Sequence, residues 1–256
     1  MTALVKGQLK ARLQRLFDQI LREYGPRGWW PIPGSAGRRG FDSLGYHPGD
    51  FRTPRTTEER FEVIMGAVLT QNTAWTNAAA ALTRLREAEV RLPADVLALP
   101  QRRLAGLVRS SGYFNQKAKK LKAIAALFSL PGALTPAAVP SRETLLSHWG
   151  IGPETADSIL LYAFHVPVFV VDAYTRRILS RIGLIGGRES YDDIQAVFHE
   201  SMEQKTALFN EYHALIVQHA KRHCRLRPDC ASCPVKPCRY RDRGGREARP
   251  VRAPRA

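Results

Sequence analysis

Four cysteines near the C-terminal end of the chain form its most specific chemical pattern. They are the only cysteines in the sequence and follow the spacing Cys-x5-Cys-x2-Cys-x4-Cys, at Cys224, Cys230, Cys233 and Cys238. Four thiolates on one loop could hold either a tetrahedral zinc ion or a [4Fe–4S] cluster. Structural zinc sites usually combine two short Cys-x2-Cys pairs, whereas this loop has one such pair between two single cysteines. The spacing therefore favours a [4Fe–4S] cluster, with zinc as the alternative.

Asp172 follows the apolar run 168–171 and precedes a helical pattern that begins at Ala173. A carboxylate in this position is an ordinary helix N-cap. It is also kept ionised by the backbone N–H groups and the dipole of the helix. An ionised carboxylate can stabilise an oxocarbenium-like sugar and orient a water molecule, so Asp172 is the candidate catalytic residue for cleavage of an N-glycosidic bond.

Two glycines lie one residue apart in the segment Gly150-Ile151-Gly152-Pro153, between two helical patterns. Glycine allows a tight turn and a close approach of the backbone, and Pro153 suits the first position of a helix. We expect the backbone N–H groups of Gly150, Ile151 and Gly152 to face a DNA phosphate, a contact that positions DNA without reading its sequence. The alternative is a plain connection between helices.

The charge balance of the chain is strongly basic. Its 256 residues include 39 Lys and Arg against 23 Asp and Glu, a formal charge of +16, which favours polyanions such as nucleic acid or an anionic membrane surface. Arg225 and Arg227 place part of this charge in the cysteine loop, where they could contact phosphates. The longest apolar stretch, 159–171, is too short and too interrupted to span a membrane.

The clustered cysteines, and a first segment without the pattern of a secretory signal, predict a reducing compartment. We therefore expect a cytoplasmic protein, associated with the nucleoid if the organism is prokaryotic.

The periodicity of the apolar residues predicts an all-α protein. An amphipathic N-terminal helix ends near Gly25, and a long basic loop covers residues 31–60. We interpret residues 166–171 as buried extended chain, because the sequence offers no second β-branched run to pair with it. Nine further helices are expected at about 58–69, 75–88, 101–110, 115–129, 141–148, 153–164, 173–183, 191–203 and 205–223.

The order of the hairpin, Asp172 and the four-cysteine loop resembles that of the helix-hairpin-helix DNA glycosylases, in particular the endonuclease III relatives. The resemblance covers roughly residues 58–238. It implies a six-helix barrel with the hairpin at 58–165, an iron–sulfur domain built from 1–57 and 166–238, and a DNA cleft between the two. It also implies a monomer that acts on double-stranded DNA containing a damaged base, with no membrane partner. The composition of residues 239–256, with seven Arg against two acids and almost nothing to bury, predicts a basic, disordered tail.

Two features depart from the endonuclease III pattern. Endonuclease III resembles this chain in its hairpin, but just after it that enzyme carries a lysine that acts as Schiff-base nucleophile. Glu154 stands at the matching position here. A carboxylate cannot form an imine, so hydrolytic, monofunctional base removal is expected. The cysteine spacing is also one residue shorter than the usual family loop at its first and third gaps.

Further motifs resemble the 3-methyladenine DNA glycosylase branch: 150–157, the stretch Leu69-Thr70-Gln71-Asn72-Thr73, and Trp29-Trp30-Pro31. This resemblance implies that Trp29 or Trp30, together with Phe61, encloses the flipped base, and that Gln71 enters the duplex in its place. An N-alkylated purine is cationic, which suits a pocket of indole rings. The matching segment 112–120 includes Lys117, which is expected to follow the DNA backbone.

Three functions remain open at this point. The first is a monofunctional glycosylase for damaged, especially alkylated, bases. The second is a bifunctional glycosylase and abasic-site lyase for oxidised pyrimidines, in which another lysine such as Lys117 or Lys120 supplies the amine. The third is a non-catalytic iron–sulfur protein that binds DNA lesions.

Overall fold

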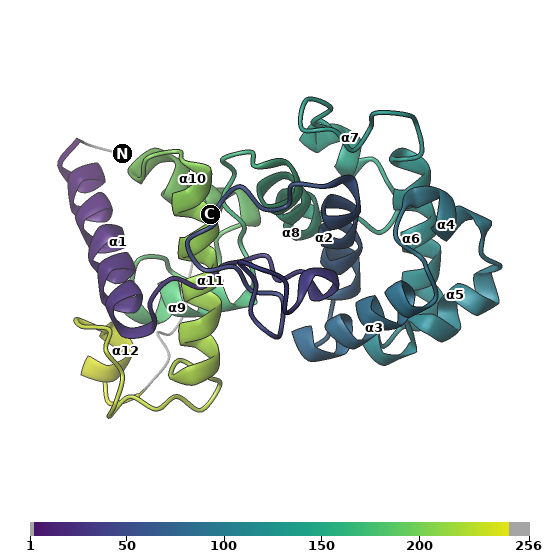
Figure 1. Ribbon diagram of the computed structural model, residues 1–256. Coiled ribbons are helices and arrows are strands. Elements are labelled where there is room, and N and C mark those ends of the chain that lie inside the picture. Colours follow the sequence, from purple (N-terminus) through teal and green to yellow (C-terminus); the bar gives the residue numbers. More distant parts are fainter. Residues whose placement is uncertain (1–2, 246–256) are drawn as a thin grey trace, which may run out of the picture. The chain divides into compact units, whose positions relative to one another are not determined.

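The computed structural model describes residues 3–245, and every regular element within that range is a helix (Figure 1). The predicted all-α class is therefore confirmed. The α-helices are α1 (Ala3–Tyr24), α2 (Thr57–Leu69), α3 (Trp75–Glu87), α4 (Pro93–Ala98), α5 (Gln101–Leu107), α6 (Phe114–Leu127), α7 (Arg142–Leu146), α8 (Pro153–Ser158), α9 (Ala173–Ile182), α10 (Tyr191–Ser201), α11 (Thr206–Arg222) and α12 (Arg239–Asp242). No helix of the described residues is long and apolar enough to cross a membrane.

Two short helices were not predicted. The six residues of α4 are too few to show a period, and the helix is fixed locally by Asp95, which accepts the N–H groups of Arg91 and Leu92. Helix α12 lies at the start of the segment predicted to be disordered. It is held by stacking of Arg181 on Tyr240, with 4.6 Å between the guanidinium carbon and the ring centre. The rest of that segment, 246–256, lies outside the described residues.

The chain forms two compact units. One contains the residues up to Arg27 together with those from Val168 onward, and the other contains residues 28–167. Residues 28–57 were assigned to the cysteine-containing domain, and this part of the prediction is wrong. The reason is that Trp30 and Ile32 are buried against the second unit and that the Gly34 N–H donates to Glu62 of α2 at 2.7 Å.

In the second unit, α2 is the central helix. A capping box of Thr56 and Glu59 fixes its start, and every residue from Arg60 to Leu69 is buried. The loop before α2 lacks periodicity but is ordered by close backbone approaches. At Gly28 a Cβ atom would lie 2.2 Å from the Pro48 nitrogen, so only glycine fits. The predicted long loop is therefore a packed part of this unit.

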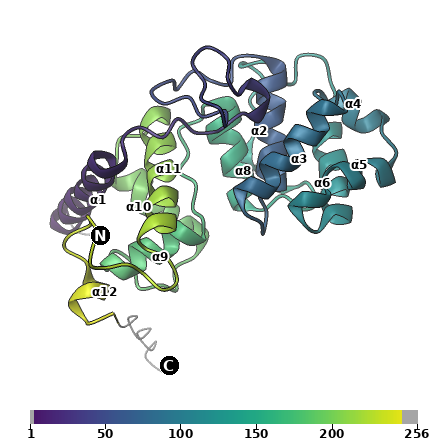
Figure 2. The same ribbon diagram turned by 60° about the horizontal axis from the view of Figure 1, so that its bottom comes forward.

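In the first unit, α1 packs against α10 and α11, and α9 packs against α11 (Figures 1 and 2). The Tyr212 hydroxyl of α11 donates to the Leu13 carbonyl of α1 at 2.8 Å, which joins the two ends of the chain. The run before Asp172 is buried and extended, and Phe169 within it stacks on Phe198 with 3.5 Å between ring centres. This agrees with the predicted extended segment, and it delivers Asp172 to the start of α9.

Candidate functional site

Asp172 is the N-cap of α9, and its surroundings keep it ionised. Its Oδ1 accepts the Thr175 N–H at 2.6 Å, and its Oδ2 lies 3.7 Å from Nε2 of His213 on α11. Burial would raise the pKa of Asp172, but the His213 imidazole and the Thr175 N–H outweigh it, so the pKa is lowered. The side chain is 12% exposed, so the carboxylate remains partly accessible.

The predicted helical hairpin consists of α7 and α8. Ser141 caps α7, Pro153 occupies the first turn of α8, and Gly150 has a φ of +83°, a conformation that glycine adopts without strain. The two helices are joined by Arg142, whose Nε and Nη2 lie 2.8 and 3.2 Å from the carboxylate oxygens of the fully buried Asp157. This paired geometry fixes the hairpin as a unit.

The three residues predicted to contact phosphate are not equivalent. Gly152 is exposed and Gly150 is partly exposed, as a phosphate contact requires. The Ile151 side chain is only 7% exposed, and its N–H already donates to the His148 carbonyl at 3.1 Å. Ile151 therefore anchors the turn, and the prediction that it faces DNA is wrong.

Gln71 lies two residues after the end of α2, and its side chain is bound to the hairpin. Its Nε2 donates to the Gly150 carbonyl at 3.0 Å and to the Thr155 hydroxyl at 2.9 Å. Its Oε1 accepts the Lys120 ammonium, and the aliphatic part of Lys120 packs against Gly150. Lys120 is thus an amine close to the hairpin, which the sequence left undecided between a surface role and a lyase role.

Lys117 does not follow the DNA backbone, and that prediction is wrong. Its side chain is 2% exposed, and its ammonium donates to the Leu69 carbonyl at 2.7 Å and to the Ser111 carbonyl at 2.6 Å. Burial, with a smaller contribution from Lys120, lowers the pKa of Lys117 to about 8. The residue joins the end of α2 to the turn before α6, because these carbonyls need a buried donor.

Glu154 lies in the first turn of α8 and is exposed. The position that carries the family lysine therefore holds an acid at the surface of the hairpin. Its side chain offers no amine for imine formation.

An aromatic cluster in the second unit includes the two predicted tryptophans. The Trp30 ring centre lies 5.1 Å from Tyr162, 5.3 Å from Trp75 and 5.9 Å from Trp29. Trp29 and Trp75 are partly exposed, whereas Trp30 is 7% and Tyr162 is 1% exposed. Trp75 and Tyr162 were missed from the sequence, although Trp75 lies only two residues after the 69–73 motif.

Phe61, predicted to enclose the base, is fully buried within α2 and has no surface to offer. This prediction is wrong because the residue falls on a helix that is buried on every face. The aromatic residues with accessible surface in this cluster are Trp29 and Trp75.

The four cysteines lie on the loop between α11 and α12, each as a partly buried free thiol. Burial raises the pKa of Cys233, and the charges of Cys224, Cys238 and Cys230 raise it further, against a hydrogen bond from the Val235 backbone that lowers it. Among residues 3–245, no three Cys, His, Asp or Glu side chains are placed to hold one metal ion.

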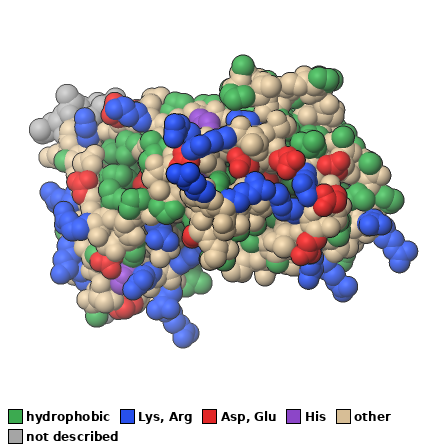
Figure 3. Space-filling model, viewed as in Figure 1, with side chains coloured by type: hydrophobic (Ala, Val, Ile, Leu, Met, Phe, Trp, Pro, Cys, Tyr) green, Lys and Arg blue, Asp and Glu red, His purple; other side chains and the backbone are tan. Residues whose placement is uncertain are grey.

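Two arginines of α9 hold the start of the cysteine loop. Arg177 donates to the Cys224 carbonyl at 2.8 Å, and Arg181 donates to the carbonyls of Arg225 and Leu226 at 2.6 and 3.2 Å. The side chains of Arg225 and Arg227 are exposed. Lys and Arg side chains are also spread, among acidic ones, over the face in Figure 3, so charge alone does not mark the site.

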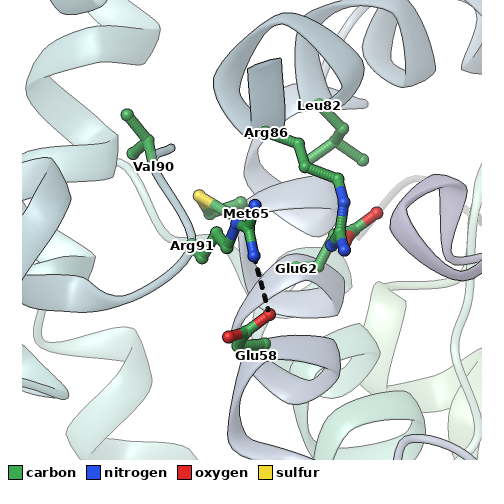
Figure 4. A pocket seen from close by; sticks show the side chains of 7 residues that line it. All are labelled: Glu58, Glu62, Met65, Leu82, Arg86, Val90 and Arg91. Carbon is green, nitrogen blue, oxygen red and sulfur yellow. Dashed lines mark ion pairs between the residues drawn. The ribbon is translucent and has the colours of Figure 1, made fainter. Parts of the chain in front are cut away.

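A charged pocket beside α2 and α3 does not belong to the candidate site (Figure 4). Glu62 pairs with Arg86 at 3.8 Å and Glu58 with Arg91 at 4.0 Å, so the charged groups of the pocket are paired with one another. Burial raises the pKa of Glu62, although the Gly34 N–H donates to this carboxylate. We interpret the pocket as a structural ion-pair network.

Comparison with known proteins agrees with these features. The model of the HhH-GPD superfamily of base excision DNA repair proteins matches residues 65–204. A protein of Methanocaldococcus jannaschii, provisionally named a DNA repair glycosylase, is 35% identical over 231 residues, which cover 88% of this chain and 94% of the relative. This chain therefore belongs to the HhH-GPD superfamily of base excision DNA repair proteins.

Two solved structures are also similar. The H. pylori 3-methyladenine DNA glycosylase bound to 1,N6-ethenoadenine is 30% identical, with a TM-score of 0.57 over 67% of this chain and 92% of that one. A non-covalent endonuclease III–DNA complex has a TM-score of 0.71 over 93% of this chain and 99% of that one. At 20% identity, the second comparison shows a shared fold.

Proposed function

We propose that this protein is a monofunctional DNA glycosylase that hydrolyses the N-glycosidic bond of a flipped, N-alkylated purine in double-stranded DNA. Asp172 carries the chemistry: its carboxylate is held by Thr175 and His213 and keeps 12% of its surface exposed. An ionised carboxylate stabilises positive charge on the sugar and orients the attacking water, while the alkylated base leaves readily because it is already cationic.

Glu154 supports the monofunctional assignment. Strand cleavage by β-elimination needs an imine between an amine and the sugar, and a carboxylate cannot form one. Hydrolysis by water requires only the carboxylate of Asp172. The expected product is an abasic site in an intact strand.

The partly exposed rings of Trp29 and Trp75 support a cationic purine as the substrate. A cation over an indole face gains about 0.5 to 2 kcal/mol, and a neutral pyrimidine does not gain this energy. The similarity to a 3-methyladenine DNA glycosylase points to the same class of base.

We also propose that Cys224, Cys230, Cys233 and Cys238 hold a [4Fe–4S] cluster. All four are free thiols on one loop, and their spacing of one Cys-x2-Cys pair between two single cysteines suits a cluster better than the paired knuckles of a structural zinc site. When bound, the cluster would close the loop and so fix Arg225 and Arg227 for contact with phosphates. The purified protein should contain iron and acid-labile sulfide in equal amounts, and Cys233→Ser should lose both. Zinc in place of iron would contradict this part of the proposal.

Base release is the direct test of the function. Duplexes with a 3-methyladenine, 1,N6-ethenoadenine, thymine glycol, uracil or 8-oxoguanine residue are incubated with the protein, and free base and strand cleavage are measured separately. Release of alkylated purines without strand cleavage, unless alkali is added, is the expected result. Release confined to oxidised pyrimidines would contradict the proposal.

Lys120 makes a bifunctional enzyme the second candidate. Its ammonium lies beside the hairpin, bound to Gln71, and it is the more accessible of the two lysines considered, because Lys117 is buried. Reduction with borohydride traps an imine as a covalent protein–DNA adduct. An adduct that is lost in Lys120→Met but retained in Lys119→Met would favour the second candidate over the first.

A further inference from the structure

We propose that His213 is the residue that positions the Asp172 carboxylate for base excision, through the contact of its Nε2 atom with Oδ2 at 3.7 Å. This inference rests on the proposed function, since it assigns a task within the same site. His213 belongs to α11, whereas Asp172 caps α9, so the contact joins two helices that pack side by side.

The two carboxylate oxygens of Asp172 are held from different helices. Oδ1 accepts the Thr175 N–H at 2.6 Å, which a capping residue does in any helix. Oδ2 has no such capping role and lies 3.7 Å from the His213 Nε2. A carboxylate held only by its cap could rotate about its terminal bond, and a second polar group close to the other oxygen limits that rotation.

Burial makes the contact specific. The His213 side chain is 5% exposed and Asp172 is 12% exposed, so little water competes with the imidazole for Oδ2. The ring is held in an aromatic environment, with its centre 6.3 Å from that of Phe169 at an interplanar angle of 86°. Phe169 in turn stacks on Phe198, so the imidazole belongs to a packed layer that restricts its movement.

Other groups near Asp172 do not replace His213. Thr175 acts on the carboxylate from α9 through its N–H. Lys221, also on α11, interacts with Asp172 by charge alone, and burial lowers the pKa of its ammonium. Thr175 and Lys221 remain in place in each His213 variant below, so neither can account for a difference among them.

Two substitutions separate positioning from packing. His213→Leu fills a similar volume but removes the donor. His213→Gln keeps an N–H group at a similar reach and cannot carry a charge. His199→Leu is the matched control, because His199 is a histidine of the same unit that accepts the Phe169 N–H at 2.9 Å and stacks on Phe209.

The first readout is the pH profile of single-turnover excision. Removal of His213 should raise the pKa of Asp172, so the acid limb of the profile moves to higher pH in His213→Leu. We expect the rate above that limb to fall about 10- to 100-fold as the carboxylate loses its orientation. His213→Gln should recover most of the rate, and His199→Leu should leave the acid limb in place.

The second readout needs no substrate. In protein labelled with ¹³C-aspartate, the carboxyl signal of Asp172 is the one that disappears in Asp172→Asn, and its titration reports the ionisation directly. The signal should titrate at higher pH in His213→Leu than in the wild type. It should return toward the wild-type position in His213→Gln.

The outcomes distinguish this inference from the proposed function. A folded His213→Leu protein with unchanged rate, pH profile and titration would overturn the inference, and so would a glutamine variant no better than leucine. Full activity of Asp172→Asn would instead overturn the catalytic role of Asp172, and with it the proposed function, whatever the titration of His213→Leu shows.

Discussion

Gln71 Nε2 donates to the Thr155 hydroxyl at 2.9 Å, so the residue expected to enter the DNA duplex is bound to the helical hairpin. To act as a wedge, the amide must leave both this hydroxyl and the Gly150 carbonyl, which it also contacts. Release of Gln71 could thus accompany contact of the hairpin with DNA.

Gln71→Ala should therefore impair base flipping more than chemistry. We expect excision from a paired duplex to fall about 10-fold, because unstacking a base costs a few kcal/mol that the wedge offsets in part. Excision from single-stranded DNA with the same lesion should change little. Asn77→Ala, which removes an exposed amide of α3, is the control. An equal loss on both substrates would count against the wedge.

The Arg142–Asp157 pair should be important for stability. Arg142→Met leaves the fully buried Asp157 without its cation and should lower the free energy of unfolding by about 3 to 5 kcal/mol. Urea unfolding measures this loss. Lys205→Met is the control, since its pair with Glu203 is 64% exposed on both sides and should contribute no more than about 1 kcal/mol. Equal losses in the free energy of unfolding for Arg142→Met and Lys205→Met would contradict the stabilising role of the Arg142–Asp157 pair.

Lys117 should make stability depend on pH. Burial and the nearby Lys120 lower its pKa to about 8 in the folded protein, against 10.5 for an ordinary lysine. Between these values the unfolded chain binds a proton that the folded protein does not, so the free energy of unfolding rises with pH across this window. Lys117→Met should remove that rise. The same pH slope in both proteins would show that the lysine is not held as described.

Arg225 and Arg227 are exposed on the cysteine loop and should each neutralise one phosphate. Replacement of either by alanine should reduce the slope of log affinity against log salt concentration by about one. Binding titrations at several salt concentrations measure this slope. Lys205→Ala, which removes an exposed cation at the start of α11, should leave it unchanged. If neither arginine variant changed the slope, the cysteine loop would not be part of the DNA interface.

Much of the fold could be predicted from the sequence, because long helices with one buried face show a period. Helices α2, α3, α6, α9 and α11 all begin and end within a few residues of the expected positions. The loop 28–56 could not be predicted, since its order comes from contacts distant in sequence, such as that between Gly34 and Glu62. Among the α-helices of residues 3–245, only α4 and α12 were not predicted at all, because both are too short to show a period.

For the candidate site, the sequence predicted some residues correctly and others not. Asp172 and the hairpin glycines lie where local sequence places them, at helix starts and turns. Lys117 and Phe61 were misjudged because burial depends on tertiary packing, and a lysine within a run of lysines gives no sign that it is enclosed. His213 was not identified because it lies 41 residues after Asp172 in the sequence, on a different helix, so no local pattern links the two.

Single-turnover excision by Asp172→Asn, measured together with DNA affinity, tests the central claim most directly. The substitution keeps the shape of the side chain and removes its charge, and Glu203→Gln serves as a control for an exposed acid. We predict that release of an N-alkylated purine falls by about 100-fold or more while the affinity for the lesion-containing duplex is retained. Excision at the wild-type rate by Asp172→Asn would contradict the account.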